Sequence, residues 1–242
     1  GYDRANPITF TVALDGTVTS TTAGAVDGKK VTMKDALTER EIEISKVSLT
    51  GHEELADAEL KIRKGTDENG EVVASWTSGS DGKDTDGKLK PHKVRLVAGT
   101  YTLSEGTAPR GYDRANPITF TVALDGTVTS TTAGAVTKDE DKTTITMKDA
   151  LTEREIEISK VDAADGVTEL AGAKLQITDE AGNVVKDKAG NELSWTTGES
   201  AEEQNEDGSA KPHKVKLVAG TYILKEVSAP FGYLIADPIT FT

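Results

Sequence analysis

The sequence predicts an all-β protein made of tandem β-sandwich domains arranged as a linear rod. Short segments alternate apolar with polar residues between Asp, Asn and Gly turns, as strands with one buried face do. Long segments recur along the 242 residues, which indicates repeated domains. Aromatic residues make up only 5% of the chain and no long apolar run is present, which disfavours membrane spans.

Internal repeats divide the chain. Residues 1–26 recur letter for letter at 111–136. Two other segments also return: TMKDALTEREIEISKV at 32–47 and 146–161, and KPHKVRLVAGTY at 90–101, as KPHKVKLVAGTY at 211–222. The period of about 110 to 120 residues is the size of one small domain and too long for a solenoid unit. We expect three parts: the last strands of an incomplete repeat at 1–37, a complete domain at 38–150, and a domain without its final strands at 151–242.

Strand patterns fill the complete period. Six strands are expected from alternation, at 41–47, 59–63, 93–97, 100–104, 118–122 and 144–147. Six or seven short strands in a period of this length are typical of an immunoglobulin-like sandwich. The segment EREIEIS also fits a short helix, but Ile42, Ile44 and Lys46 follow the period of two that a strand requires.

Composition excludes several classes of function. The formal charge of −13 argues against nucleic acid or an anionic membrane as a partner, since both attract Lys and Arg. Without cysteine, neither a disulfide nor a Cys-based thioester can cross-link these domains. No signal peptide or sorting signal is recognisable, so we expect an excised fragment of a longer protein. Neither a cofactor nor a metal is expected.

Three strands of the complete period carry an apolar stripe that ends in an ionisable residue on the same face. The stripes are Ile42, Ile44 and Lys46; Tyr101, Leu103 and Glu105; and Ile145, Met147 and Asp149. The final part repeats two of these ends as Lys160 and Glu226, and the opening part repeats the third stripe as a strand with Val31, Met33 and Asp35. A single charged strand end usually reaches solvent, but three equivalent ends suggest a shared site.

Burial of such a trio would change its chemistry. Desolvation lowers the pKa of an amine and raises the pKa of a carboxyl group, so the amine becomes nucleophilic and the carboxyl electrophilic. A second carboxyl group could then shuttle the proton that leaves with water. The product is an amide between side chains. The alternative is a buried salt bridge, which is costly unless it is well hydrogen-bonded.

Two long segments carry a family resemblance. YTLSEGTAPRGY at 101–112 and YILKEVSAPFGY at 222–233 resemble the YxLxExxAPxGY box of Cna B-type, SpaA-like (prealbumin-like) repeat domains of Gram-positive surface adhesins and pilins. ISKVD at 158–162, LAGAKLQI at 170–177 and ITMKDA at 145–150 add to the likeness, and ITMKDA is similar to the peptide half of an engineered tag and catcher pair. The resemblance covers essentially the whole chain.

The resemblance implies a role for each ionisable residue. Lys46 would be the nucleophile, Glu105 the catalytic acid and Asp149 the acceptor of an autocatalytic isopeptide bond. Lys160 and Glu226 would be the matching pair of the final domain. It further implies a stalk or spacer anchored to the Gram-positive cell wall, with single-turnover chemistry and no enzyme activity. The absence of pilin-type YPK and LPxTG motifs favours an adhesin stalk over a polymerised pilin shaft.

The incomplete parts complement each other. Residues 1–37 supply Asp35 without a lysine, whereas residues 151–242 supply Lys160 and Glu226 without an acceptor. We therefore expect head-to-tail association, with Asp35 of one chain beside Lys160 of the next, because an open sheet edge and an unpaired buried lysine are both unfavourable. A window on a longer continuous fibre is the alternative.

Other features of the sequence could suggest functions besides a stalk. The acidic loops at 81–88 and 199–207 lack the ligand spacing of an EF-hand, and His92 and His213 have no second His or Cys nearby. The alternative function is an adhesin module that binds a host protein or glycan, and the parent protein could also reach a host ligand through a tip domain. Trp76 and Trp195 are the only candidates for an aromatic binding platform, yet their shared SWT context suggests anchors in the sandwich.

Overall fold

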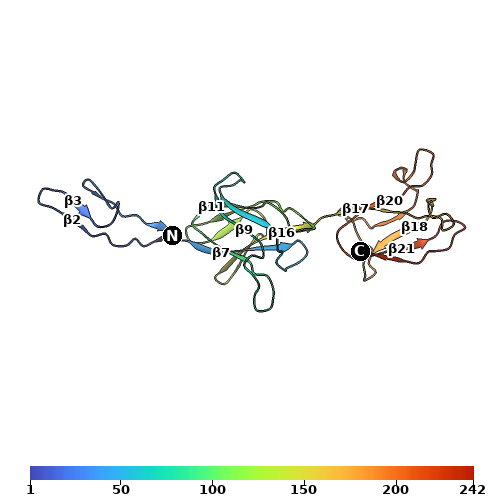
Figure 1. Ribbon diagram of the computed structural model, residues 1–242, viewed down its shortest axis with the longest axis horizontal. Coiled ribbons are helices and arrows are strands. Elements are labelled where there is room, and N and C mark those ends of the chain that lie inside the picture. Colours follow the sequence, from blue (N-terminus) through green and yellow to red (C-terminus); the bar gives the residue numbers. More distant parts are fainter. The chain divides into compact units, whose positions relative to one another are not determined.

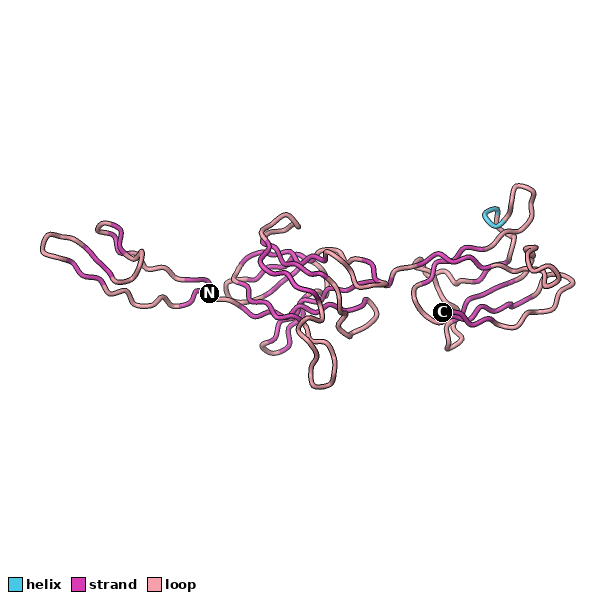
Figure 2. Tube along the Cα trace, viewed as in Figure 1, coloured by secondary structure: helices cyan, strands magenta, loops and turns pink.

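The computed structural model describes all 242 residues and divides them into two compact units, residues 1–150 and 151–242 (Figure 1). Strands provide almost all regular structure, and the exception is one 3-10 turn, η1 (Ala201–Glu203) (Figure 2). The prediction of tandem all-β sandwich domains is confirmed. None of the helical structure is long and apolar enough to cross a membrane.

Residues 40–151 form the first sandwich, which has two five-stranded sheets. One sheet has the order β10-β7-β16-β12, with β15 pairing β16: β10 (His92–Leu96), β7 (Arg40–Ser48), β16 (Lys142–Leu151), β12 (Tyr112–Asp113) and β15 (Val136–Asp139). The other has the order β14-β13-β11-β8-β9: β14 (Val128–Ser130), β13 (Ile118–Val122), β11 (Gly99–Glu105), β8 (Glu59–Lys64) and β9 (Val72–Thr77). Each strand expected from alternation overlaps one of these.

Side chains between the two sheets form one apolar core. The alternation seen in the sequence supplies it, because every second residue of a strand points to the same face. The buried members are Ile42, Ile44, Ala58, Leu60, Ile62, Val94, Leu96, Tyr101, Leu103, Ile118, Phe120, Val122, Ala135, Ile145 and Met147. Burial of this apolar surface is the main term that stabilises the sandwich.

Pairing of β7 with β16 positions the candidate site. These two strands, the first and the last of the sandwich, run parallel, and Met147 lies opposite Lys46 while Asp149 lies opposite Ser48. In the facing sheet, β11 pairs with β8 and ends with Glu105 opposite Leu60. The charged ends of three apolar stripes are thereby brought to one end of the core.

Residues 1–37 form three short ladders without a buried core of their own. The pairs are β1 (Tyr2–Asp3) with β6 (Ala36–Leu37), β2 (Phe10–Val12) with β3 (Val18–Ser20), and β4 (Val26–Asp27) with β5 (Lys30–Val31). Pairing of β2 with β3 copies the register of β13 with β14. The side chain environment differs, however, since Phe10 is 49% exposed and the equivalent Phe120 is 1% exposed.

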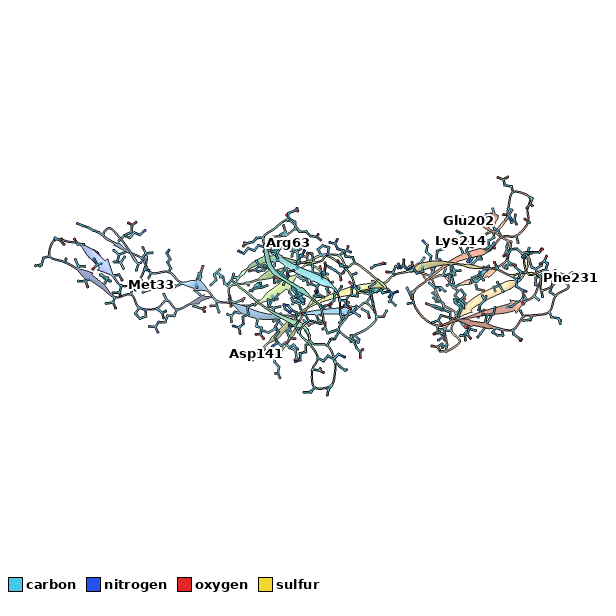
Figure 3. All side chains as sticks on the ribbon, viewed as in Figure 1. Met33, Arg63, Asp141, Glu202, Lys214 and Phe231 are labelled. Carbon is cyan, nitrogen blue, oxygen red and sulfur yellow. The ribbon has the colours of Figure 1, made fainter.

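One expectation for the opening residues is wrong. The stripe Val31, Met33 and Asp35 was expected to form a strand like Ile145, Met147 and Asp149, but the segment from Thr32 to Asp35 is not in a strand. Met33 is exposed (Figure 3), whereas Met147 is fully buried. The physical reason is that residues 1–37 contain no neighbour equivalent to β7 against which this segment could pair.

Residues 151–242, the second unit, form a smaller sandwich. β17 (Arg154–Ile158) pairs with β20 (His213–Leu217), and a four-stranded sheet has the order β19 (Ser194–Thr196), β18 (Lys174–Thr178), β21 (Tyr222–Ser228) and β22 (Ile239–Phe241). The buried core is Ile158, Ala173, Leu175, Ile177, Val215 and Leu217. Strand β17 pairs only with β20, so the edge that β16 covers on β7 has no strand here. Lys160 lies just beyond the end of β17 rather than within it.

Candidate functional site

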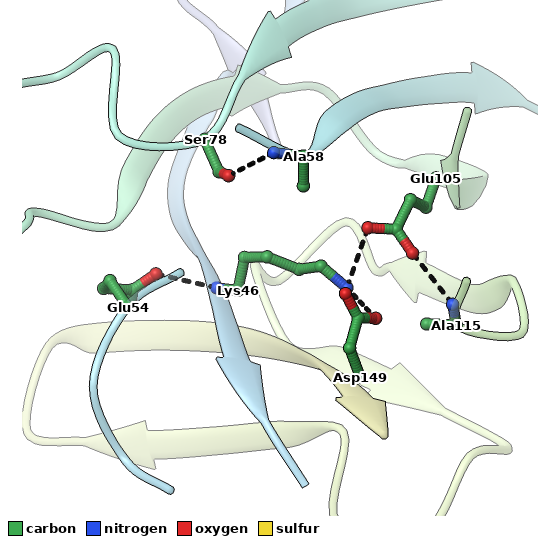
Figure 4. A network of polar contacts seen from close by, with 7 residues as sticks. All are labelled: Lys46, Glu54, Ala58, Ser78, Glu105, Ala115 and Asp149. Carbon is green, nitrogen blue, oxygen red and sulfur yellow. Dashed lines mark hydrogen bonds and ion pairs between the residues drawn. The ribbon is translucent and has the colours of Figure 1, made fainter. Parts of the chain in front are cut away.

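Lys46, Glu105 and Asp149 meet inside the first sandwich (Figure 4). Their side chains are 1%, 0% and 0% exposed. Lys46 Nζ lies 3.0 Å from Glu105 Oε1 and donates a hydrogen bond to Asp149 Oδ1. An amine and two carboxyl groups are thus in direct contact in a site from which water is excluded.

Glu105 is held by a second contact. Its Oε2 accepts a hydrogen bond of 2.8 Å from the backbone N–H of Ala115. Burial raises the pKa of Glu105, while the bond from Ala115 and the contact with Lys46 act in the opposite direction; the nearby Asp149 charge adds to the rise. Glu105 is therefore suited to hold a proton at a pH where an exposed glutamate is ionised.

Hydrogen bonding around Asp149 is incomplete. Asp149 Oδ1 accepts from Lys46, but the buried Oδ2 has no hydrogen-bond partner. A buried carboxylate oxygen without a donor is costly, because it has lost its water and gained nothing in exchange. Loss of one carboxyl oxygen in an amide condensation would remove this cost. The arrangement contains the amine, the acyl group and the proton carrier that this condensation needs.

The second unit contains part of the same cluster. Lys160 Nζ lies 3.7 Å from Glu226 Oε1, with side chains 16% and 2% exposed. Glu226 Oε2 accepts a hydrogen bond of 2.6 Å from the N–H of Ala236, as Glu105 does from Ala115. Glu226 is the only ion-pair partner of the Lys160 side chain, and Asp35 is exposed and makes no ion pair. The structure thus assembles one complete trio and one pair.

The tryptophans are anchored and do not form a free aromatic surface. Trp76 stacks on His92 with ring centroids 4.3 Å apart, and Trp195 stacks on His213 at 4.1 Å. Each tryptophan also packs against the core of its own sandwich. No cluster of three or more His, Asp or Glu side chains is placed to hold a metal ion.

Each histidine ring also contacts an acidic side chain of the preceding loop. His92 Nδ1 lies 2.8 Å from Asp81 Oδ2, and His213 Nδ1 bonds Glu203 Oε1. The acidic loops are therefore tied to the first residue of β10 and of β20. These contacts give the histidine of KPHKV the same structural role at both strand entries.

Sequence reasoning missed two glutamates next to the lysines. Glu54 contacts the backbone of Lys46, and Glu169 contacts the backbone of Lys160. Both lie in loops, where a glutamate is ordinarily solvated. The signal that could have found them is the Glu-Leu pair that recurs at 54–55 and 169–170, eight or nine residues after each lysine.

Comparison with known proteins identifies the family. The model of the SpaA prealbumin-like fold domain matches twice, over residues 40–137 and 154–242. The chain therefore belongs to the SpaA family of prealbumin-like domains, as the sequence motifs predict. A search of curated proteins finds no match.

Several solved structures are similar over most of this chain. The Bacillus anthracis TIE protein is 28% identical over 95% of this chain and 36% of its own, with a TM-score of 0.40. A streptococcal ancillary pilin is 21% identical over 93% of this chain and 64% of its own, with a TM-score of 0.33. The shaft pilin SpaA from Lactobacillus rhamnosus GG is 18% identical, covering 84% and 93%, with a TM-score of 0.30. The chain spans less than two thirds of the length of the first two.

Replacing the buried amine should make stability depend on pH. In Lys46→Met, Glu105 and Asp149 face each other without a cation, and burial holds the pKa of Glu105 above its unfolded value. A carboxyl group with a raised folded pKa stabilises the fold below its unfolded pKa and loses that contribution as pH rises through the folded value. The variant should therefore be less stable at about pH 8 than at about pH 5.

The free energy of unfolding is measured at each pH by urea unfolding followed by Trp76 fluorescence, in a Trp195→Phe background. Its change with pH is the slope to be compared. Lys46→Met combined with Glu105→Gln is the matched control, because the amide cannot ionise, and its slope should be smaller. Equal slopes for the single and double variants would show that Glu105 does not titrate in the interior.

Proposed function

We propose that this chain is a structural stalk or spacer of a cell-surface adhesin or fibre, stapled by an amide between Lys46 and Asp149. The observation that carries the proposal is the buried contact of Lys46 with Glu105 and Asp149. The predicted division at 37 and 38, into an incomplete repeat and a complete domain, is part of the proposal. So is location on the cell wall of a Gram-positive bacterium, which family membership and the resemblance to surface repeats support.

The proposed reaction balances without an external reagent. The Lys46 ammonium transfers a proton within the cluster, and the neutral Nζ attacks Cγ of Asp149. A C–N bond forms, a C–O bond breaks, and one Asp149 oxygen leaves as water with protons relayed through Glu105. An ammonium and a carboxylate thereby become one neutral amide and one water. Burial favours this direction because charged groups are costly in the interior.

The position of the proposed Lys46 to Asp149 amide suits a domain that carries mechanical load. β7 and β16 are the first and last strands of the first sandwich, and they are parallel neighbours. A pulling force that enters at β7 and leaves at β16 would pass through the Lys46 to Asp149 amide. The segment between the two side chains, which are 103 positions apart in the sequence, would then be shielded from extension. Such a domain keeps its length under tension, as a stalk must.

Head-to-tail joining of copies is the second part of the proposal. The segment VTMKDA at 31–36 matches ITMKDA at 145–150, so it can add to the open edge of β17 as β16 adds to β7. In the same register, Met33 would lie opposite Lys160, and Asp35 would follow two residues later. Addition of this strand would cover the exposed Met33 and bring an acceptor to Lys160 of the next copy.

Removal of the proton carrier should stop the staple without removing the fold. In Glu105→Gln, the reacting groups Lys46 and Asp149 remain, but the group that relays protons is lost. We expect denatured parent chains to be one water lighter than their sequence and Glu105→Gln chains to keep their full mass, with similar circular dichroism. An exposed glutamate variant, Glu68→Gln, is the control and should cross-link like the parent. Cross-linking of Glu105→Gln at the parental rate would show that Glu105 has another role.

Incubation of the concentrated chain should produce covalent multimers. Boiling in denaturant followed by electrophoresis is expected to show a ladder whose rungs disappear in Asp35→Ala and in Lys160→Ala. Asp27→Ala, which removes another exposed aspartate of the same opening residues, should leave the ladder intact. A single monomer band from the parent at every concentration would contradict head-to-tail linkage, while leaving the intramolecular staple untouched.

A further inference from the structure

A loop holds the backbone of Lys46 at the point where β7 has passed the end of β10. Pairing of β7 with β10 ends at Ile44 opposite His92, and beyond this point the outer edge of β7 has only an isolated antiparallel bridge between Val47 and Glu54. The N–H of Lys46 instead donates to Glu54 Oε2 at 2.8 Å (Figure 4), and the carbonyl of Lys46 accepts from the N–H of Leu55 at 2.6 Å. Both backbone polar groups of the lysine are therefore bound by two consecutive residues.

Glu54 is itself fixed. Its second oxygen, Oε1, accepts a hydrogen bond from the hydroxyl of Ser45, so the carboxylate bridges two consecutive residues of β7. Burial raises the pKa of Glu54, and the bonds from Ser45 and Lys46 act in the opposite direction. A loop glutamate that is partly buried and bonded through both oxygens is not a solvated surface charge.

In the second unit the backbone of Lys160 is held by the same two hydrogen bonds, although no acceptor aspartate is present. Lys160 N–H donates to Glu169 Oε2 at 3.1 Å, and Leu170 N–H donates to the Lys160 carbonyl at 2.7 Å. Here no aspartate contacts the lysine and no strand covers the open edge of β17. These two hydrogen bonds to the lysine backbone therefore form without an acceptor strand, and they are not a consequence of a contact between lysine and aspartate.

We infer that Glu54 and Glu169 are positioning residues, which fix the backbone of the nucleophilic lysine so that its amine is aimed before the acceptor carboxyl arrives. The inference rests on the proposed amide-forming function. A lysine side chain has many rotamers, and its reach is set by where its backbone is held. Displacement of a reacting group by about 1 Å costs up to about a hundredfold in rate. A strand end held only on its β16 side would permit such displacement.

Substitution of Glu54 should therefore slow the reaction more than it harms the fold. The full chain is made by cell-free synthesis, synthesis is stopped, and the fraction of chains lighter by one water is measured over time by mass spectrometry. Glu54→Ala and Glu54→Asp should cross-link about tenfold more slowly or worse, since neither side chain can reach the Lys46 N–H. Glu54→Gln should react close to the parental rate, because its amide oxygen still accepts that bond.

A matched control separates positioning from general stability. Ser78→Ala removes the hydroxyl that accepts a buried hydrogen bond of 2.9 Å from the N–H of Ala58, at another loop of the same sandwich. It should lower the melting temperature yet leave the cross-linking rate unchanged. If Ser78→Ala and Glu54→Ala slow the reaction equally at matched stability, Glu54 is merely structural and the inference is overturned.

The remaining outcomes also support or overturn the inference. If Glu54→Ala does not fold, Glu54→Asp, which keeps the charge and shortens the side chain by one methylene, takes its place. A parental rate in that variant overturns the inference. A parent chain that never loses water refutes the proposed function itself, which is a different result from a reactive parent whose rate Glu54 does not affect.

Discussion

Contact of the Lys46 amine with two carboxyl groups in a buried interior is the interaction on which the proposed staple of the first sandwich depends. Ions lose their hydration when they are buried, and mutual attraction repays that loss only with good geometry and full hydrogen bonding. Here Asp149 Oδ2 has no donor, so the cluster is incompletely satisfied as an ion pair. Conversion to an amide would resolve this, because it removes both reacting charges and the orphan oxygen together.

The two sheets can be understood from what this contact requires. Lys46 and Asp149 must lie on adjacent strands with matching faces, and the parallel pairing of β7 with β16 provides this. Glu105 must come from the facing sheet, where β11 is buried along its length from Tyr101. A covalent link across 103 residues of sequence would restrict the unfolded chain, which for a cross-link of this span is worth about 4 to 5 kcal/mol in the chain-entropy model.

The sequence was informative where strand alternation coincided with burial. Apolar stripes ending in Lys46, Glu105 and Asp149 predicted their meeting, since every second residue of a strand shares a face. Local pattern failed where tertiary neighbours decide: Phe10 and Phe120 lie in identical 26-residue segments, yet only Phe120 has β11 beside it and is buried. Likewise Asp149 lies in a strand and Asp35 does not, although their flanking residues match.

Glu54 shows another limit of sequence reasoning. A glutamate in a loop gives no periodic signal, and its importance comes from a backbone N–H that is left unpaired where β10 ends. A backbone N–H without a partner in a neighbouring strand can be recognised only once the strand pairing is known. Asp81 and Glu203 also give no periodic signal, because their contacts with the rings of His92 and His213 depend on the path of long loops.

Tryptic digestion of the denatured parent chain, followed by tandem mass spectrometry, tests the central claim most directly. The account predicts a branched peptide in which the Lys46 side chain is joined to the Asp149 side chain, with the loss of one water and no cleavage after Lys46. Separate, unmodified peptides containing Lys46 and Asp149, recovered quantitatively from correctly folded protein, would contradict it.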